Sequence, residues 1–301
     1  MCAGPLAPAD DRRWACPAGH HFDVARQGYL NLLVAGQRRS RRPGDDDEMV
    51  TARRRFLATG AYDPVSAALA RTATAALATA TPAAPAPGVG GPDQRAPVVL
   101  DVGCGEGHHT RRVAAAVEAD GRWSGTAVLG VDVAKRAVAL AAAAHPGGAY
   151  AVASAAALPL ADGAVDVCLD VFGPVMVDEL ARVIAPGGAL VVAHPAPDHL
   201  ASLRRLVYAE ARPHETKDPL RAGRDRFGRV ATASVAFPLV FTAAEELAAL
   251  FTMTPYRWHA ARDTAERLAE AASRPGGFVT GVDVVVSTYR RNNNRPAAPP
   301  S

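Results

Sequence analysis

The chain has 301 residues, of which 49% are hydrophobic and 21% are charged, and its formal net charge at pH 7 is +3. This composition excludes a disordered chain, the sequence lacks the run of about 18 to 20 apolar residues that spans a membrane, and four cysteines do not make a disulfide framework. The polar start, with Asp10 and Asp11, is unlike a signal peptide, so a cytoplasmic protein with no membrane partner is expected.

Residues 1–36 are predicted to form a small cap. They combine Cys2, Cys16 and His20 with many turn-forming residues, and their apolar stretches are too short to build a core unaided. Cys16 and His20 are four residues apart, a spacing that one turn can fold around a tetrahedral zinc ion. A cap without metal, packed by its aromatic residues, is the alternative.

Residues 37–81 are predicted to form a helical connector. The carboxylates of Asp45 to Asp47 would stabilise the start of a helix after them, because a helix start exposes unpaired N–H groups. Val65 to Thr79 is an alanine-rich run that predicts a second helix. Residues 82–97 hold five prolines and three glycines, which predicts a linker.

Between residues 98 and 290 the pattern alternates between strands and helices. Apolar, β-branched runs bounded by turn residues predict five strands, at Val98–Val102, Ala127–Val133, Tyr150–Ser154, Val165–Phe172 and Ala189–His194. Strands joined by helical crossovers predict an α/β fold with a doubly wound parallel sheet covered on both faces.

The rest of this region is less regular. It predicts a helix from Pro197 through Leu206, a strand near Val235 to Phe241, a helix around Glu245 and a last strand at Val282 to Tyr289. Residues 291–301 are predicted to be a disordered tail.

Three glycines follow the first strand of the predicted sheet. Gly103, Gly105 and Gly107 allow the backbone to bend sharply and to approach a ligand closely, and the helix that opens at His108 presents unpaired N–H groups. A dinucleotide fingerprint has the spacing G-x-G-x-x-G, whereas this loop has G-x-G-x-G. The loop therefore predicts a nucleoside-containing cofactor other than a nicotinamide dinucleotide.

Asp132 ends the second strand of the same sheet. A carboxylate at this position can accept hydrogen bonds from both hydroxyls of a ribose. An aspartate at a strand end also commonly caps the next helix, and this reading is the alternative. The glycine loop and the acid together favour the ribose.

The segments ALPLADGAVDVCLDVF (157–172) and ELARVIAPGGALVVAHP (179–195), with the loop and Asp132, make residues 98–195 resemble class I, Rossmann-like S-adenosylmethionine-dependent methyltransferases. The segments CPAGH (16–20), HFDVARQGYLNLL (21–33), RRSRRPGDDDEMVTARRRFLATGAYDP (38–64) and FTMTPYRW (251–258) extend the likeness. Nearly the whole chain resembles the RlmA family of 23S ribosomal RNA guanine-N1 methyltransferases, which includes the tylosin-resistance enzymes.

This resemblance implies an S-adenosylmethionine-dependent enzyme whose partner is a hairpin of 23S rRNA, and it implies macrolide resistance as the consequence. It also implies a methyltransferase domain at residues 98–290 and a zinc-ribbon-like cap that precedes it in the chain. The implied cofactor contacts are Tyr62, Gly103, Gly105, Glu106, Gly107, His108, Asp132 and His199. Alternatively, Tyr62 only fastens the helices to the sheet and His199 only caps its helix.

The implied zinc site departs from the family pattern, which is C-x2-C followed by C-x3-H. Cys2, Cys16 and His20 match three of its ligands, and no residue matches the first cysteine. The ligand set for zinc is therefore incomplete. Cys104 and Cys168 are expected to be core thiols.

Asp170, Phe172 and Pro174 are the catalytic candidates, because they lie at the end of the fourth strand, where class I nitrogen methyltransferases hold their target. Phe172 can stack on a base and Asp170 can take a proton. Alternatively, Asp170 is only a buried, hydrogen-bonded turn residue. The basic flanks, above all Arg38 to Arg55, are where RNA phosphates would be held, although the acids at Asp45 to Glu48 interrupt them.

Two rival functions stay open. A small-molecule methyltransferase accounts for the sheet but not for the cap, and a non-enzymatic zinc-ribbon adaptor accounts for the cap but not for the glycine loop. The sequence also leaves open the target guanine, the catalytic base, the choice between housekeeping and self-resistance, and the oligomeric state, with a homodimer among the alternatives.

Overall fold

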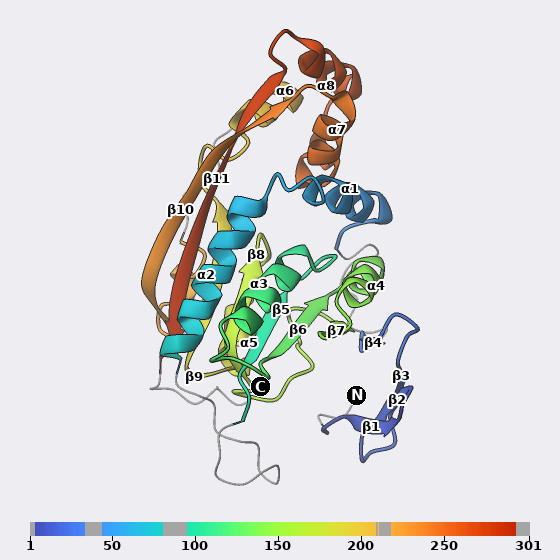
Figure 1. Ribbon diagram of the computed structural model, residues 1–301, viewed down its shortest axis with the longest axis vertical. Coiled ribbons are helices and arrows are strands. Elements are labelled where there is room, and N and C mark those ends of the chain that lie inside the picture. The colour runs from blue at the N-terminus through green and yellow to red at the C-terminus, as the bar shows by residue number, and fades with distance from the viewer. Residues whose placement is uncertain (1–3, 34–43, 81–94, 209, 211–217, 293–301) are drawn as a thin grey trace.

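The computed structural model describes residues 4–33, 44–80, 95–208, 210 and 218–292. Its main body is an eight-stranded mixed sheet in the order β10-β11-β9-β8-β5-β6-β7-β4 (Figure 1). The five predicted strands are all present, as β5 (Val98–Val102), β6 (Ala127–Asp132), β7 (Ala149–Val152), β8 (Val165–Val171) and β9 (Ile184–Pro195). These five run parallel to one another, as expected.

Two long antiparallel strands, β10 (Phe227–Phe241) and β11 (Phe278–Arg291), extend the sheet beyond β9. The strand order reverses at β5, because β6 lies on one side of it and β8 on the other. Ligands of such sheets bind beyond the carboxyl ends of the strands at this reversal. The glycine loop after β5 therefore lies where a ligand is expected.

Alternate residues of the central strands face opposite layers of helices. Val99, Val167 and Leu169 belong to a core cluster with α2 (Asp63–Thr79) and α3 (His108–Ala119). Leu100 and Cys168 face the opposite core, with α5 (Val177–Val183). This alternation is the period of two of a β-strand, and it explains why the parallel strands are apolar throughout.

The helices α1 (Asp47–Leu57), α6 (Ala201–Val207), α7 (Ala244–Thr252) and α8 (Thr264–Ser273) form a separate layer. Figure 1 shows α1, α7 and α8 beyond the carboxyl ends of the parallel strands. We refer to these three helices and α6 together as the roof. As predicted, an aspartate caps α1, because Asp46 accepts a hydrogen bond from the Met49 N–H at 2.8 Å. No helix in the described ranges is long and apolar enough to cross a membrane.

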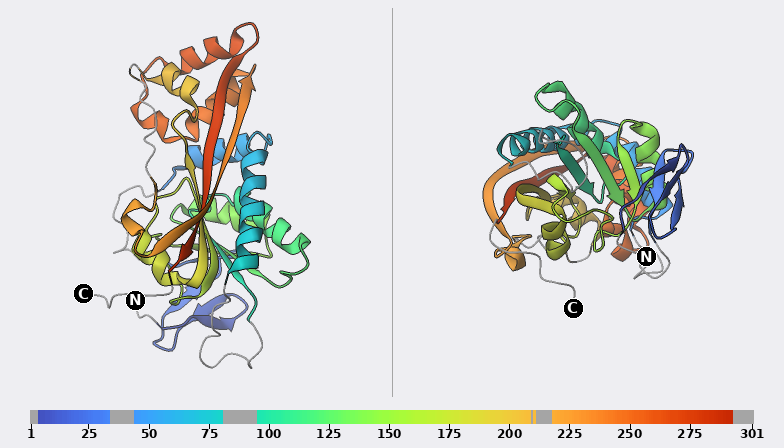
Figure 2. Two further views of the ribbon diagram at one scale, coloured as in Figure 1. Left: turned by 90° about the vertical axis from the view of Figure 1, so that its left-hand side faces the viewer. Right: turned by 90° about the horizontal axis from the view of Figure 1, so that it is seen from below.

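The N-terminal cap is a three-stranded antiparallel sheet of β1 (Ala7–Asp10), β2 (Arg13–Ala15) and β3 (His21–Asp23). It lies at the end of the molecule opposite the roof, in both Figure 1 and the left view of Figure 2. The next strand, β4 (Tyr29–Asn31), leaves the cap and pairs parallel to β7 at the edge of the main sheet. The chain that leaves the cap is thereby joined to the main sheet by backbone hydrogen bonds.

The remaining regular elements are α4 (Lys135–Ala144), which covers β6 and β7, and two short 3-10 helices, Arg221–Gly223 and Pro255–His259. Part of the predicted linker, residues 82–94, lies outside the described residues, as do Cys2 and residues 293–301 of the predicted tail.

Candidate active site

The glycine loop is held between β5 and β6 by backbone hydrogen bonds. The N–H groups of Gly103 and Cys104 both donate to the Val131 carbonyl, at 2.8 and 3.1 Å. The Gly105 N–H donates to Asp132 Oδ2 at 2.9 Å. All three loop glycines have positive φ angles, +74°, +55° and +78°, which other residues rarely adopt.

Two of the loop glycines, Gly103 and Gly107, have different surroundings and therefore different roles. A Cβ built on Gly103 would meet no atom within 4 Å, so this residue borders open space. A Cβ on Gly107 would lie 2.9 Å from Ala141 Cβ, so Gly107 allows α3 to pack closely against α4. The open side of Gly103 can receive a ligand, and the closed side of Gly107 cannot.

Asp132 is oriented by this loop and is not the N-cap of α4, which is Ala134. Its Oδ2 accepts the Gly105 N–H, and its Oδ1 accepts the Ala134 N–H at 2.8 Å. A carboxylate oxygen has two acceptor sites. Asp132 thus keeps capacity on both oxygens to accept the two hydroxyls of a ribose.

Two further carboxylates are buried at the same edge of the sheet. Asp101 Oδ2 accepts from the Thr110 hydroxyl, and Asp170 Oδ1 accepts from the Gly173 N–H at 3.0 Å. Asp101 Oδ1 and Asp170 Oδ2 have no hydrogen-bond partner among the residues described. Burial raises the pKa of Asp101 to about 7 and that of Asp170 to about 6. Such groups exchange protons near neutral pH, as acid–base residues must.

Phe172 directly follows β8 with an unusual backbone. Its φ is +57°, and its side chain is 43% exposed. Its ring lies 5.8 Å from the ring of His199, and the neighbouring Leu200 also has a positive φ of +51°. Non-glycine residues in this conformation are strained, and strained residues cluster at functional sites. The fold thus presents an aromatic face beside Asp170.

Among the other predicted contacts, Tyr62 and His199 are both buried. The Tyr62 ring packs edge-on against Phe56 at 5.4 Å and against Phe237 at 6.4 Å, and burial raises the pKa of its hydroxyl. His199 Nδ1 accepts the Asp283 N–H at 3.2 Å. These contacts agree with a structural role for both residues, and their contact with a ligand stays a prediction.

Glu106 and His108 are also largely buried beside the loop. Glu106 pairs with Arg111 at 3.4 Å, and burial raises the pKa of its carboxyl. His108 Nε2 is buried without a hydrogen-bond partner in the described part of the chain, and burial lowers the pKa of the imidazole.

Arg53 is a site residue that the sequence did not single out. It belongs to α1, in the stretch expected to hold RNA, but its guanidinium points to the glycine loop: a Cβ built on Gly105 would lie 3.9 Å from Arg53 Nη1. The helical period of the sequence could have indicated this position. Arg53 is three to four residues from the buried Met49, Val50, Phe56 and Leu57, and therefore lies on the buried face of α1.

The metal site is described only in part. Cys16 Sγ and His20 Nδ1 lie 3.2 Å apart across a turn closed by the Cys16 N–H to His20 carbonyl bond. These two residues fit neighbouring corners of a tetrahedral zinc site. Within the described residues no group of three or more histidine, cysteine or acidic side chains could hold a metal, and Cys2 lies outside them.

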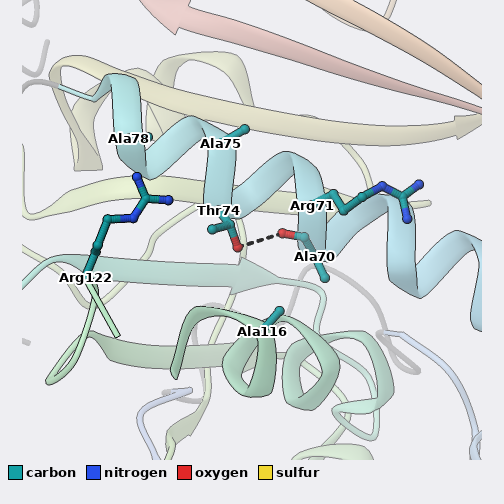
Figure 3. Close-up of a pocket in the computed structure, with 7 residues that line it drawn as sticks. All are labelled: Ala70, Arg71, Thr74, Ala75, Ala78, Ala116 and Arg122. Atoms are coloured by element: carbon teal, nitrogen blue, oxygen red, sulfur yellow. Dashed lines mark hydrogen bonds between the residues drawn. The ribbon is translucent and has the colours of Figure 1, made fainter. Parts of the chain in front are cut away.

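A shallow groove between α2 and α3 is separate from this site (Figure 3). Alanines line most of it, with Arg71 and Arg122 beside them, and Thr74 turns its hydroxyl back to the Ala70 carbonyl at 3.0 Å. It includes none of the predicted cofactor, catalytic or metal residues.

Comparison with known families divides the chain as the fold does. Residues 1–41 match the zinc-ribbon family model described as "RlmA, N-terminal", and residues 99–188 match the model described as "Methyltransferase domain".

Curated relatives match a larger part of the chain. A 23S rRNA (guanine(748)-N(1))-methyltransferase of Streptomyces fradiae is 43% identical over 67% of this chain and 64% of its own length. A Micromonospora griseorubida protein, provisionally named a 23S rRNA (guanine-N(1)-)-methyltransferase, is 45% identical over 67% of this chain and 66% of its own length. A Bacillus subtilis protein with the same provisional name is 28% identical over 95% of this chain and 94% of its own length. The matched part of the chain spans just under two thirds of the length of the first two.

Proposed function

The chain belongs to the RlmA family, and from this membership we propose that it transfers a methyl group from S-adenosylmethionine to N1 of a guanine in 23S rRNA. One observation carries the proposal: a single chain joins the RlmA zinc-ribbon segment to a glycine loop whose Gly103 borders open space, beside an oriented Asp132. A small-molecule methyltransferase needs the loop and has no use for the cap.

The residues at the loop fit the cofactor. The two oxygens of Asp132 would accept the ribose hydroxyls, and the open side of Gly103 leaves room for the rest of the molecule. When bound, S-adenosylmethionine supplies an electrophilic methyl group on a sulfonium. The main task of the protein is then to orient the acceptor nitrogen and exclude water, since displacement at a methyl group requires an in-line approach.

The guanine would lie against Phe172, beside Asp170. Guanine N1 carries a proton that must leave as the nitrogen attacks, so a base is needed within hydrogen-bond reach. Asp170 Oδ2 has no partner among the described residues, and a carboxyl with a pKa of about 6 is mostly ionised at neutral pH. Asp170 would take the N1 proton as the nitrogen attacks the methyl group that the bound cofactor would supply.

The substrate is proposed to be a hairpin loop whose base is exposed before it reaches the crevice. The Streptomyces fradiae relative is named for guanine 748, and we assign the same nucleotide to this chain, with macrolide resistance as the biological consequence. We place the enzyme in the cytoplasm, as its rRNA-methylating relative implies.

Primer extension on 23S rRNA tests the proposal. Incubation with the full chain and S-adenosylmethionine should create a strong stop next to guanine 748, because N1 methylation blocks base pairing. Asp132→Ala should abolish the stop at low cofactor concentration. Methylation of free guanosine as fast as of the hairpin would contradict the proposal and favour a small-molecule methyltransferase.

A further inference from the structure

We propose that Arg53 binds the carboxylate of the methionine part of the cofactor and so couples the roof to cofactor binding. This inference rests on the proposed use of S-adenosylmethionine. It assigns a binding role to a residue of α1, outside the sheet and outside the glycine loop.

The position of Arg53 is the first argument. Its Nη1 lies 3.9 Å from the place of a Cβ on Gly105, which is the middle glycine of the loop. The charges of Asp132 and Glu106 act on the guanidinium, so it lies among the acids of the site. Arg54 and Arg55, the next two residues of α1, are exposed instead.

The charge of the site is the second argument. Glu106 and Asp132 place negative charge at the glycine loop, which suits the ammonium group and ribose hydroxyls of the cofactor but repels its carboxylate. Arg111 is engaged by Glu106, and Arg112 by Asp63. Arg53 also pairs with Asp45, but of these three cations it alone comes within 4 Å of the place of a Cβ on Gly105. It can offer the carboxylate a cation at the loop, and a guanidinium pairs with a carboxylate through two parallel hydrogen bonds.

Arg53 also has donors to spare. One Nη1 hydrogen is used by Asp45 Oδ2, and one Nη2 hydrogen by the Met253 carbonyl at 2.9 Å. A guanidinium has five N–H donors, so three remain. The two existing bonds hold the side chain against the start of α1 and the end of α7, and thus aim it at the loop before a ligand arrives.

A purely structural role is the competing explanation, since the same two bonds tie the roof together. Ligand chemistry separates the two roles. S-adenosylhomocysteine carries the carboxylate, whereas its decarboxylated analogue keeps the ammonium, sulfur and adenosine and lacks only that group. A residue that binds the carboxylate affects the first ligand alone.

Calorimetry on the full chain is the test. Arg53→Gln should weaken S-adenosylhomocysteine binding by roughly tenfold to a hundredfold, the usual worth of a hydrogen-bonded charge, and change binding of the decarboxylated analogue by less than about threefold. Arg53→Lys keeps the charge without the planar fork and should lose less. It also serves as the test if Arg53→Gln does not fold. Arg55→Gln, on the exposed face of the same helix, is the matched control and should bind both ligands as the natural chain does.

Asp45→Ala completes the design, because it removes one of the two bonds that tie the roof together, while the bond to the Met253 carbonyl still holds the guanidinium at the loop. It should weaken S-adenosylhomocysteine binding far less than Arg53→Gln. Equal losses in the two variants, or equal losses for the two ligands, would show that Arg53 is structural and overturn the inference. Failure of the natural chain to bind S-adenosylhomocysteine would instead contradict the proposed function.

Discussion

At the scale of single residues, Asp170 is the proposed base, and its buried charge also lowers the free energy of unfolding. Its carboxyl is fully buried, and its pKa rises from an ordinary 3.8 to about 6 because burial disfavours the charge. A folded-state pKa above the unfolded one means that the folded state holds its proton longer. The contribution of Asp170 to the free energy of unfolding therefore falls as the pH rises from about 4 to about 6.

We expect Asp170→Asn to raise the melting temperature at pH 8, where the natural chain buries a charge, and to change it little at pH 4. The stabilisation should be on the order of 2 kcal/mol. The same variant should bind S-adenosylhomocysteine normally but lose most methyl transfer, and transfer by the natural chain should decline below about pH 6. Normal transfer by Asp170→Asn would exclude Asp170 as the base.

Tyr62 poses a choice between packing and ligand contact. Its ring lies between Phe56 and Phe237, so Tyr62→Ala should destabilise the fold by roughly 3–5 kcal/mol, as loss of a buried aromatic ring does. Tyr62→Phe keeps the ring and removes only the hydroxyl. A weaker affinity of Tyr62→Phe for S-adenosylhomocysteine, with an unchanged melting temperature, is expected if the hydroxyl contacts the cofactor. Unchanged affinity would leave packing as its whole role.

At the scale of elements, the contact of α3 with α4 depends on Gly107. Gly107→Ala forces a Cβ to within 2.9 Å of Ala141 Cβ at a φ of +78°, so it should lower the free energy of unfolding by more than the roughly 1–2 kcal/mol that a left-handed non-glycine residue costs. Gly103→Ala has the same backbone strain without the clash. It should unfold less readily than Gly107→Ala in urea, while its affinity for S-adenosylhomocysteine falls. The reverse order of stability would contradict this account.

The turn between β2 and β3 gives a prediction about metal. Cys16 and His20 approach to 3.2 Å, and Cys2 is the one further cysteine near them in the sequence, so we expect the full chain to bind less than one equivalent of zinc. Elemental analysis after purification measures this directly. Cys16→Ser should lower the zinc content further and leave S-adenosylhomocysteine binding unchanged, because the cap lies away from the glycine loop. A full equivalent that survives this substitution would show that zinc binds elsewhere.

The elements differ in how far the sequence predicts them. The five parallel strands are clear in the sequence, because both of their faces are buried and their apolar runs are unbroken. β4 has three residues, and its pairing with β7 depends on tertiary contacts that no local pattern records. The helix α8 is also missed: its buried residues, Leu268 and Ala271 among them, stand between charged ones in a short segment.

The candidate site was predicted in part for the same reason. The glycines and Asp132 are visible because a strand end, a loop and a helix start follow one another along the chain. Arg53 reaches the loop from a helix some fifty residues earlier, so its place depends on how the roof packs. The basic run that contains Arg53 suggested RNA binding. In the structure Arg53 lies on the buried face of α1, whereas Arg54 and Arg55 are exposed.

At the scale of the whole molecule, the row formed by Asn31, Val152 and Asp132 sets a fixed distance. Asn31 of β4 pairs with Val152 of β7, which in turn pairs with Asp132 of β6. Neighbouring strands are about 4.8 Å apart. The backbone of Asn31, just after the cap, therefore lies about 10 Å from that of Asp132, the residue proposed to bind the ribose.

The molecule can therefore act as a ruler on its substrate. If the cap grips one part of the RNA and the crevice takes the guanine, the spacing between them along the hairpin must match the spacing built into the sheet. Lengthening the hairpin stem by two or three base pairs should abolish methylation while binding of the RNA persists, and bases inserted at the distal end should have no effect. A hairpin methylated equally well at every stem length would show that the cap does not measure the substrate.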